Sequence, residues 1–178
     1  MCALVVAGCG GGSAAKKTSV KKWVSTYCGA FATWEQSVQS DSVKFQTLLN
    51  GLRASGNKDV TKIRAQMSAI FARLVTESEK LGDKVKAAGT PDMKSGDKLK
   101  NGAVSAFSRL ATEFGKEKQI IAKLPTTNPR DFTTRVSAIS DSVGSSIATL
   151  GNAIRNLDKY KTAEFKKAEN NDLTCQNL

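Results

Sequence analysis

Histidine is the residue whose absence limits the chemistry of this protein most. None of the 178 residues is a histidine, so the commonest general base at neutral pH and the commonest transition-metal ligand are both missing. Ser–His–Asp and Cys–His catalysis are therefore excluded. Lysine, aspartate, glutamate and tyrosine could still do chemistry, but no motif arranges them for it. We accordingly predict that the chain is not an enzyme and that it uses no metal and no cofactor.

Cys9 is the residue to which the sequence assigns the clearest chemical role. A short apolar run, residues 3–7, and the small residue Gly8 precede it, and a stretch of glycine, serine and alanine follows it. Residues 6–9 (Val-Ala-Gly-Cys) resemble the lipobox of bacterial lipoproteins, in which a signal peptidase cuts before the cysteine and the cysteine then carries acyl chains. The resemblance implies that Cys9 is lipidated and holds the protein at a membrane.

The position of Cys9 divides the chain into three parts. Signal peptides normally have ~15–30 residues and a positive start, whereas eight uncharged residues precede Cys9. We therefore expect residues 1–8 to be the end of a signal peptide whose start codon lies upstream. Residues 9–18 would be the lipidated cysteine with a flexible spacer, and residues 19–178 the folded domain. The alternative is a cytosolic protein in which Cys9 matches the pattern by chance.

The cysteines predict one disulfide. The chain has four, at positions 2, 9, 28 and 175. Cleavage would remove Cys2 and acylation would occupy Cys9, which leaves Cys28 and Cys175 in an oxidising compartment. A bond between them would join the two ends of the folded region and stabilise it by about 5 kcal/mol in the chain-entropy model. The alternative is two unrelated buried thiols; no cysteine spacing fits a zinc motif.

Apolar residues recur in steps of three and four from Val20 onward, which predicts amphipathic helices. The first helical stretch ends at residues 54–57, either as one long helix or as two that meet near residues 40–42. The second runs from about residue 59 to 88, with Gly89 as its C-terminal cap. The most regular stripe belongs to the fourth helix: Phe132, Val136, Ile139, Val143, Ile147, Leu150, Ile154 and Leu157.

Caps and prolines predict where the later helices begin and end. Thr90 and Pro91 suggest an N-cap and first helical residue for the third helix, and Asn128-Pro129 repeats that signal for the fourth. Pro125 ends the third helix, and a short polar helix covers about residues 159–171. These elements predict an all-α fold, an antiparallel up-down-up-down four-helix bundle with a short C-terminal helix. The sequence contains no run of ~18 apolar residues, which is the length that a helix needs to span a bilayer.

Two polar residues, Glu117 and Ser78, fall on the apolar stripes. Glu117 is either a buried carboxylate with a raised pKa or a rim residue paired with Arg64 across a hairpin centred near Thr90, and we favour the ion pair. Ser78 and Gly102 would meet across the same hairpin, where they would allow close helix packing or leave a small apolar pocket. Close packing is the better interpretation.

Four aromatic residues share one face of the first helix: Trp23, Tyr27, Phe31 and Trp34. Such a stripe could form a binding groove or dip into a membrane interface. Most stripes of this kind belong to a core, and we predict a core here.

The net charge of +11, from 27 Lys plus Arg against 16 Asp plus Glu, attracts anionic partners. Lysines at positions 16, 17, 21 and 22 lie between the proposed anchor and the first helix. Near an anionic lipid surface each could add up to ~1 kcal/mol of binding, although a solvated charge run is an equal alternative. Cell-wall polymer and envelope protein are further candidate partners. No nucleic-acid-binding motif is present, which argues against nucleic acid.

Several features together resemble small actinobacterial cell-envelope lipoproteins: the lipobox, the glycine-rich spacer, Trp23-Val24 and Cys28-Gly29-Ala30 on the first helix, Gly89-Thr90-Pro91 and the terminal Cys175. The resemblance implies a helical domain on the outer face of the cell membrane. The favoured function is a lipid-anchored binding or interaction module. The alternatives are a secreted or anchored enzyme that uses carboxylate or lysine chemistry, and a cytosolic basic protein that binds nucleic acid.

Overall fold

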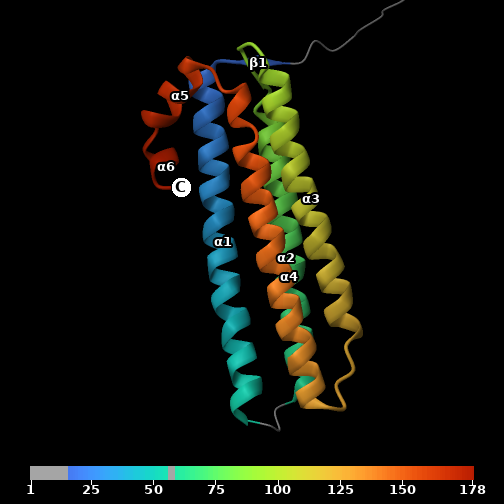
Figure 1. The fold of residues 1–178 in the computed structure, drawn as a ribbon. Helices are drawn as coiled ribbons and strands as arrows, with labels where there is room; N and C mark the ends of the chain where they lie inside the picture. The colour runs from blue at the N-terminus through green and yellow to red at the C-terminus, as the bar shows by residue number, and fades with distance from the viewer. Residues whose placement is uncertain (1–15, 56–58) are drawn as a thin grey trace, which may run out of the picture.

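The computed structural model describes residues 16–55 and 59–178, most of which are helical. Four long helices lie side by side (Figure 1): α1 (Val20–Ser55), α2 (Val60–Ala87), α3 (Gly96–Lys123) and α4 (Pro129–Arg155). Within the described ranges the strands are a single parallel pair of two residues each, β1 (Lys17–Thr18) and β2 (Thr90–Pro91). The predicted all-α class is thereby confirmed.

Helix α1 is continuous through residues 40–42, so the two-helix alternative is wrong. Asp41 does not break the helix because its side chain is buried and paired. The carboxylate accepts hydrogen bonds from Arg73 on α2 and from Lys44 one turn later on α1. The apolar stripe then continues with Phe45.

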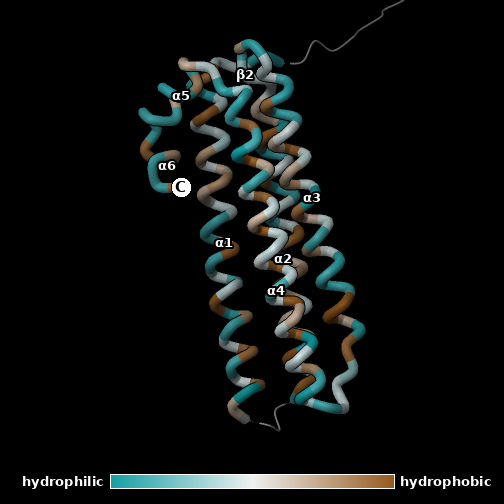
Figure 2. Tube along the Cα trace, viewed as in Figure 1, coloured by the Kyte–Doolittle hydropathy of each residue, from teal (hydrophilic) through white to brown (hydrophobic). Residues whose placement is uncertain are grey.

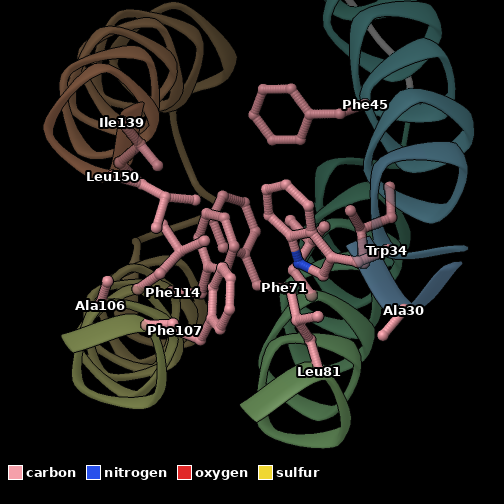
Figure 3. Close-up of a cluster of buried hydrophobic side chains, with 14 of the residues drawn as sticks. Ala30, Trp34, Phe45, Phe71, Leu81, Ala106, Phe107, Phe114, Ile139 and Leu150 are labelled. Atoms are coloured by element: carbon pink, nitrogen blue, oxygen red, sulfur yellow. The ribbon is translucent and has the colours of Figure 1, made fainter. Parts of the chain in front are cut away.

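The core lies between the four long helices and consists of their apolar stripes. Figure 2 shows apolar residues spaced along each helix, and Figure 3 shows their side chains meeting in the centre. The ring of Phe71 meets those of Phe45 and Phe114 edge to face, with centroids 5.8 and 6.3 Å apart. The residues of α2 that recur in steps of three and four from Val60 to Val85 are buried, Ser78 included. Its hydroxyl accepts a hydrogen bond of 3.0 Å from Trp34 Nε1, so both buried polar groups are satisfied.

The connection from α2 to α3 differs from the prediction. Thr90 and Pro91 form β2, and α3 begins only at Gly96. Gly89 has φ +82°, which turns the backbone away from the helix and toward β1, as its predicted role at the helix end requires. The Thr90 N–H then donates to the Lys16 carbonyl at 2.9 Å, and the Asp92 N–H donates to the Thr18 carbonyl at 2.8 Å. Strand pairing has replaced the predicted helix start.

The longer connection shifts the α2–α3 register. Gly82 lies opposite Phe107, and Gly115 lies opposite Val75, so both pairs are centred close to Ser95 instead of Thr90. Ser78 and Gly102 are therefore not brought together as predicted. Gly102 packs instead against Leu157 at the end of α4, whose Cδ2 lies 2.4 Å from the place that a Cβ would take. The absence of a side chain at Gly102 thus allows this close approach.

The fourth helix begins as predicted but is less buried than its regular stripe suggested. The Asn128 side chain accepts hydrogen bonds from the Arg130 and Asp131 amides, with Pro129 in the first turn. Phe132, Val136, Ile139 and Leu150 are buried, whereas Val143, Ile147 and Ile154 are half-buried. The middle of α4 therefore leaves part of its apolar face uncovered.

The C-terminal segment is three short pieces where one helix was predicted. They are a 3-10 turn η1 (Asp158–Tyr160), α5 (Ala163–Asn170) and α6 (Leu173–Gln176). Thr162 caps α5 and Asp172 caps α6, because their side-chain oxygens accept hydrogen bonds from backbone amides of the first turn. Each cap favours a new helix start, which is why the segment is divided.

We expect Gly89→Ala to lower the free energy of unfolding by more than about 2 kcal/mol, because alanine is strained at positive φ. The added Cβ would also lie 2.4 Å from the Lys16 carbonyl oxygen. Gly144→Ala is the matched control: Gly144 lies inside α4 with nothing near its Cβ position, so alanine should stabilise by up to about 1 kcal/mol. Urea unfolding measures both; equal effects at the two sites would contradict the strand-pair geometry.

Candidate functional site

The end of the molecule that carries β1 is where the proposed tether joins the folded domain. Cys9 and residues 1–8 lie outside the described residues. Lys17 and Thr18, which the sequence assigned to the spacer, form β1. The Lys17 ammonium pairs with Asp92 at 2.8 Å, and the Thr18 hydroxyl donates to the Ala88 carbonyl at 2.6 Å. The chain therefore enters the fold already attached to the α2–α3 connection.

The side chain of Trp23 secures the same junction from inside. It is 1% exposed, and its Nε1 donates to the Gly89 carbonyl at 3.0 Å. Its ring stacks on that of Tyr27 with centroids 5.2 Å apart and meets Phe165 of α5 at 5.8 Å. The first turns of α1, the end of α2 and the C-terminal segment are thus packed together.

The predicted aromatic stripe on α1 is part of the core. Trp23 and Trp34 are buried, and Tyr27 and Phe31 are half-buried and pack against the core. Burial, and then the nearby carboxylates of Glu169 and Asp158, raise the pKa of Tyr27 well above its usual value. The prediction of a core is confirmed.

The lysines predicted to contact a membrane surface lie at this end. Lys16, Lys21 and Lys22 are exposed, and none of them takes part in an ion pair with another described residue. Lys17 is also exposed but is paired with Asp92. Three of the four predicted lysines are therefore available to an external partner.

Cys28 and Cys175, the pair predicted to bond, form a disulfide in the structure. Cys28 lies on α1 and is 2% exposed, and Cys175 lies on α6. Their Cα atoms are 5.1 Å apart and they are separated by 147 positions in the sequence. The bond attaches the C-terminal segment to the helix that follows the proposed tether.

We expected Glu117 at the rim of the core, paired with Arg64, but it is buried and has another partner. Its carboxylate accepts a hydrogen bond of 2.6 Å from the Ser142 hydroxyl on α4. Arg64 donates instead to the Leu124 carbonyl at the end of α3, at 2.9 Å. The shift in register explains the error. A hairpin centred near Thr90 would place Arg64 opposite Glu117, whereas one centred near Ser95 places Arg64 beside the end of α3.

The buried carboxylate that sequence reasoning missed is Asp41. It is 4% exposed. Arg73 donates hydrogen bonds to its carboxylate from both Nε and Nη2, at 3.2 and 2.8 Å. Burial raises the pKa of Asp41, but the hydrogen bonds from Arg73 and Lys44 outweigh that effect and hold the pKa below its ordinary value. The signal was present: Asp41 is spaced by threes and fours from Val38 and Phe45, so it belongs to the apolar stripe.

A narrow cleft of about 90 Å³ opens between α1 and α4, next to Asp41. Phe45, Phe71 and Phe114 line its inner part, and the half-buried Val143 and Ile147 of α4 line one side. Figure 3 shows Phe45 reaching from α1 across this space toward α4. The cleft exists because the middle of α4 does not close against α1.

Two further features bear on chemistry. Among the described residues, no group of three or more cysteine and acidic side chains is placed to hold a metal ion. No described helix is both long enough and apolar enough to cross a bilayer.

Comparisons with known proteins find no relative: no family model, no curated protein and no solved structure matches this chain.

We expect Asp41→Asn to destabilise the protein by about 1–2 kcal/mol at neutral pH, because the amide cannot hold Arg73 as a charged partner. A carboxyl whose pKa is lower in the folded state contributes stability above its unfolded pKa, near 3.8, and loses it as the pH falls through the folded value. The difference in the free energy of unfolding between wild type and variant should therefore become smaller below about pH 4. Chemical unfolding from pH 7 to pH 2 measures this, and a constant gap would contradict the assignment.

Removing the disulfide should destabilise the domain by up to about 5 kcal/mol, since the closed loop is long. The variant is Cys28→Ala with Cys175→Ala, and thermal unfolding is followed with and without reductant. Reduced wild type should melt together with the variant, whose own melting should not respond to reductant. If complete reduction left the melting temperature of the wild type unchanged, the bond would contribute nothing to stability.

Proposed function

We propose that this chain is a lipid-anchored binding or interaction module on the outer face of a cell membrane, attached through acyl chains on Cys9. Its scaffold is an antiparallel up-down-up-down four-helix bundle, with the C-terminal segment packed on α1. The lipobox-like residues 6–9 supply the anchoring chemistry, and the rest of the chain supplies a rigid body for interaction.

The observation that carries the proposal is the bond between Cys28 and Cys175. Structural disulfides persist in oxidising compartments and are rare in the reducing cytosol. Two cysteines so distant in sequence meet with bonding geometry, which favours a protein that folds outside the cytoplasm. A lipid on Cys9 is the attachment that the sequence offers to such a protein.

The position of β1 supports the same proposal. The chain enters the domain at one end of the long helices and not along their sides (Figure 1). Residues 10–15 can span at most about 20 Å when extended, so an acylated Cys9 would hold this end close to the lipid. The opposite end of the helices would extend away from the membrane, where partners could reach it.

The two buried carboxylates bear on the enzyme alternative. Asp41 is paired with Arg73 and Lys44, and Glu117 with Ser142. Acid–base catalysis by two carboxylates needs both in one cleft with different pKa values. These two carboxylates are instead bound to side chains of the same chain. We therefore favour binding over catalysis.

The test is the intact mass of the protein purified from membranes of its native host, beside a Cys9→Ala variant. We expect a mature chain that begins at Cys9, carries acyl chains and has lost two hydrogens to the disulfide. Cys9→Ala should gain no lipid and leave the membrane fraction, because the acylated thiol is missing. A wild-type mass equal to the unmodified 178 residues would overturn the proposal.

A further inference from the structure

The fold gathers lysines from several elements at the end of the molecule that carries β1. Residues 16–22, 83–100 and 158–161 meet there through the strand pair, the α2–α3 connection and the turn after α4 (Figure 1). These ranges hold eleven lysines, four aspartates and no arginine, glutamate or histidine, so their formal charge is +7. We call this set of lysines the basic end: Lys16, Lys17, Lys21, Lys22, Lys84, Lys86, Lys94, Lys98, Lys100, Lys159 and Lys161.

Few of these lysines are needed by the fold itself. In the described residues, Lys17 pairs with Asp92, and Lys161 pairs with Asp158 and Glu169. The other nine form no ion pair within the described chain, and eight of them are exposed. Lys98 and Lys159 lie over the ring of Tyr160, at 5.9 and 5.2 Å. The aspartates neutralise little of the remaining charge, since Asp92 and Asp158 are already paired.

The two lysines in the first turn of α1 make the helix less stable. Lys21 and Lys22 stand there, and that turn has no acidic residue. Cations are unfavourable at a helix N-terminus because the helix dipole is positive there. Residues that conflict with local stability are expected where a surface serves function. An anion in front of this end would be attracted by the lysines and by the dipole together.

The opposite end of the helices provides the comparison. It is basic too, and its cations are of two kinds: arginines engaged in the fold, and exposed residues that form no ion pair within the described chain, which are Lys62, Lys118, Lys123 and Arg130. Arg53 donates to Ser137, Arg64 to Leu124 and Arg135 to Asp131. The basic end differs in two ways: it has more exposed lysines, and the proposed tether leaves from among them.

We infer that the basic end is a docking surface for the anionic phosphate headgroups of a phospholipid membrane, so that the helices stand end-on to the bilayer. This inference rests on the proposed function for its geometry, because the tether brings this end to within about 20 Å of the lipid. The attraction acts within a Debye length of about 8 Å, so it requires the flat approach of this end. The exposed lysines of β1, α1, α2, the α2–α3 connection and η1 would touch headgroups together.

The binding test uses the full chain with Cys9→Ser, so that acylation plays no part in the result. Binding is measured to vesicles of phosphatidylcholine with and without phosphatidylglycerol. The test variant changes Lys16, Lys21, Lys22 and Lys94 to Gln. The matched control removes the same charge at the far end, with Lys62, Lys118, Lys123 and Arg130 changed to Gln; all eight residues are exposed.

We expect binding only to the phosphatidylglycerol vesicles, and weaker binding as salt is added. Each lysine at an anionic surface contributes on the order of fivefold, so the test variant should bind about a hundredfold or more weakly. The control variant should lose less than about fivefold. An equal loss in both variants would overturn the inference, as would equally tight binding to short duplex DNA through the same lysines.

Orientation is tested by coupling the thiol of Cys9, in a Cys2→Ser chain, to a maleimide lipid in a supported bilayer. The 36 residues of α1 are about 54 Å long, so end-on docking predicts a protein layer of about that thickness in neutron reflectometry. A layer about as thin as two packed helices, on the order of 20 Å, would overturn end-on docking. Neither experiment involves native acylation, so a failure here is distinguishable from an unmodified mass in the host.

Discussion

At Gly89 the backbone leaves α2 with positive φ, and the arrangement of one whole end of the molecule depends on that turn. The turn aims Thr90 at the carbonyl of Lys16, which sets β1 beside β2. It also exposes the Gly89 carbonyl to the indole of Trp23. Two hydrogen bonds in the strand pair and one from the indole thus bind the incoming chain to the α2–α3 connection. A residue with a side chain at this position would collide with the Lys16 carbonyl.

The same turn explains what could not be predicted about the α2–α3 hairpin. Apolar spacing places residues on a face of a helix, and the large apolar residues at that spacing on α2 and α3 are buried. Spacing carries no information on the length of a connection, which sets the register between two helices. Reading Thr90-Pro91 as a helix start shortened the connection by five residues. The pairing of Glu117 with Arg64 was wrong as a consequence.

Charged residues on apolar stripes posed the other difficulty. Glu117 continues a stripe, but we expected it at the rim, and it is buried. Asp41 has the same kind of spacing, but flanking serines suggested a break in the helix. What keeps it in the core is Arg73, which is distant in sequence and on another helix. A buried carboxylate requires a partner, and a single sequence does not show which partner three-dimensional packing will supply.

The C-terminal segment completes the cover over the aromatic face of α1, whose other residues pack against α2 and α3. Its helices α5 and α6 have eight and four residues, too short to be stable alone in water. Phe165 is the one residue of α5 that is buried, and it lies against Trp23. The disulfide fixes the segment to α1 at Cys28, the residue after Tyr27. Without this covalent attachment, the entropy of a short segment would compete with a single buried ring, and Trp23 would lose its contact with Phe165. The bond that places the chain outside the cytoplasm in our proposal therefore also completes the core.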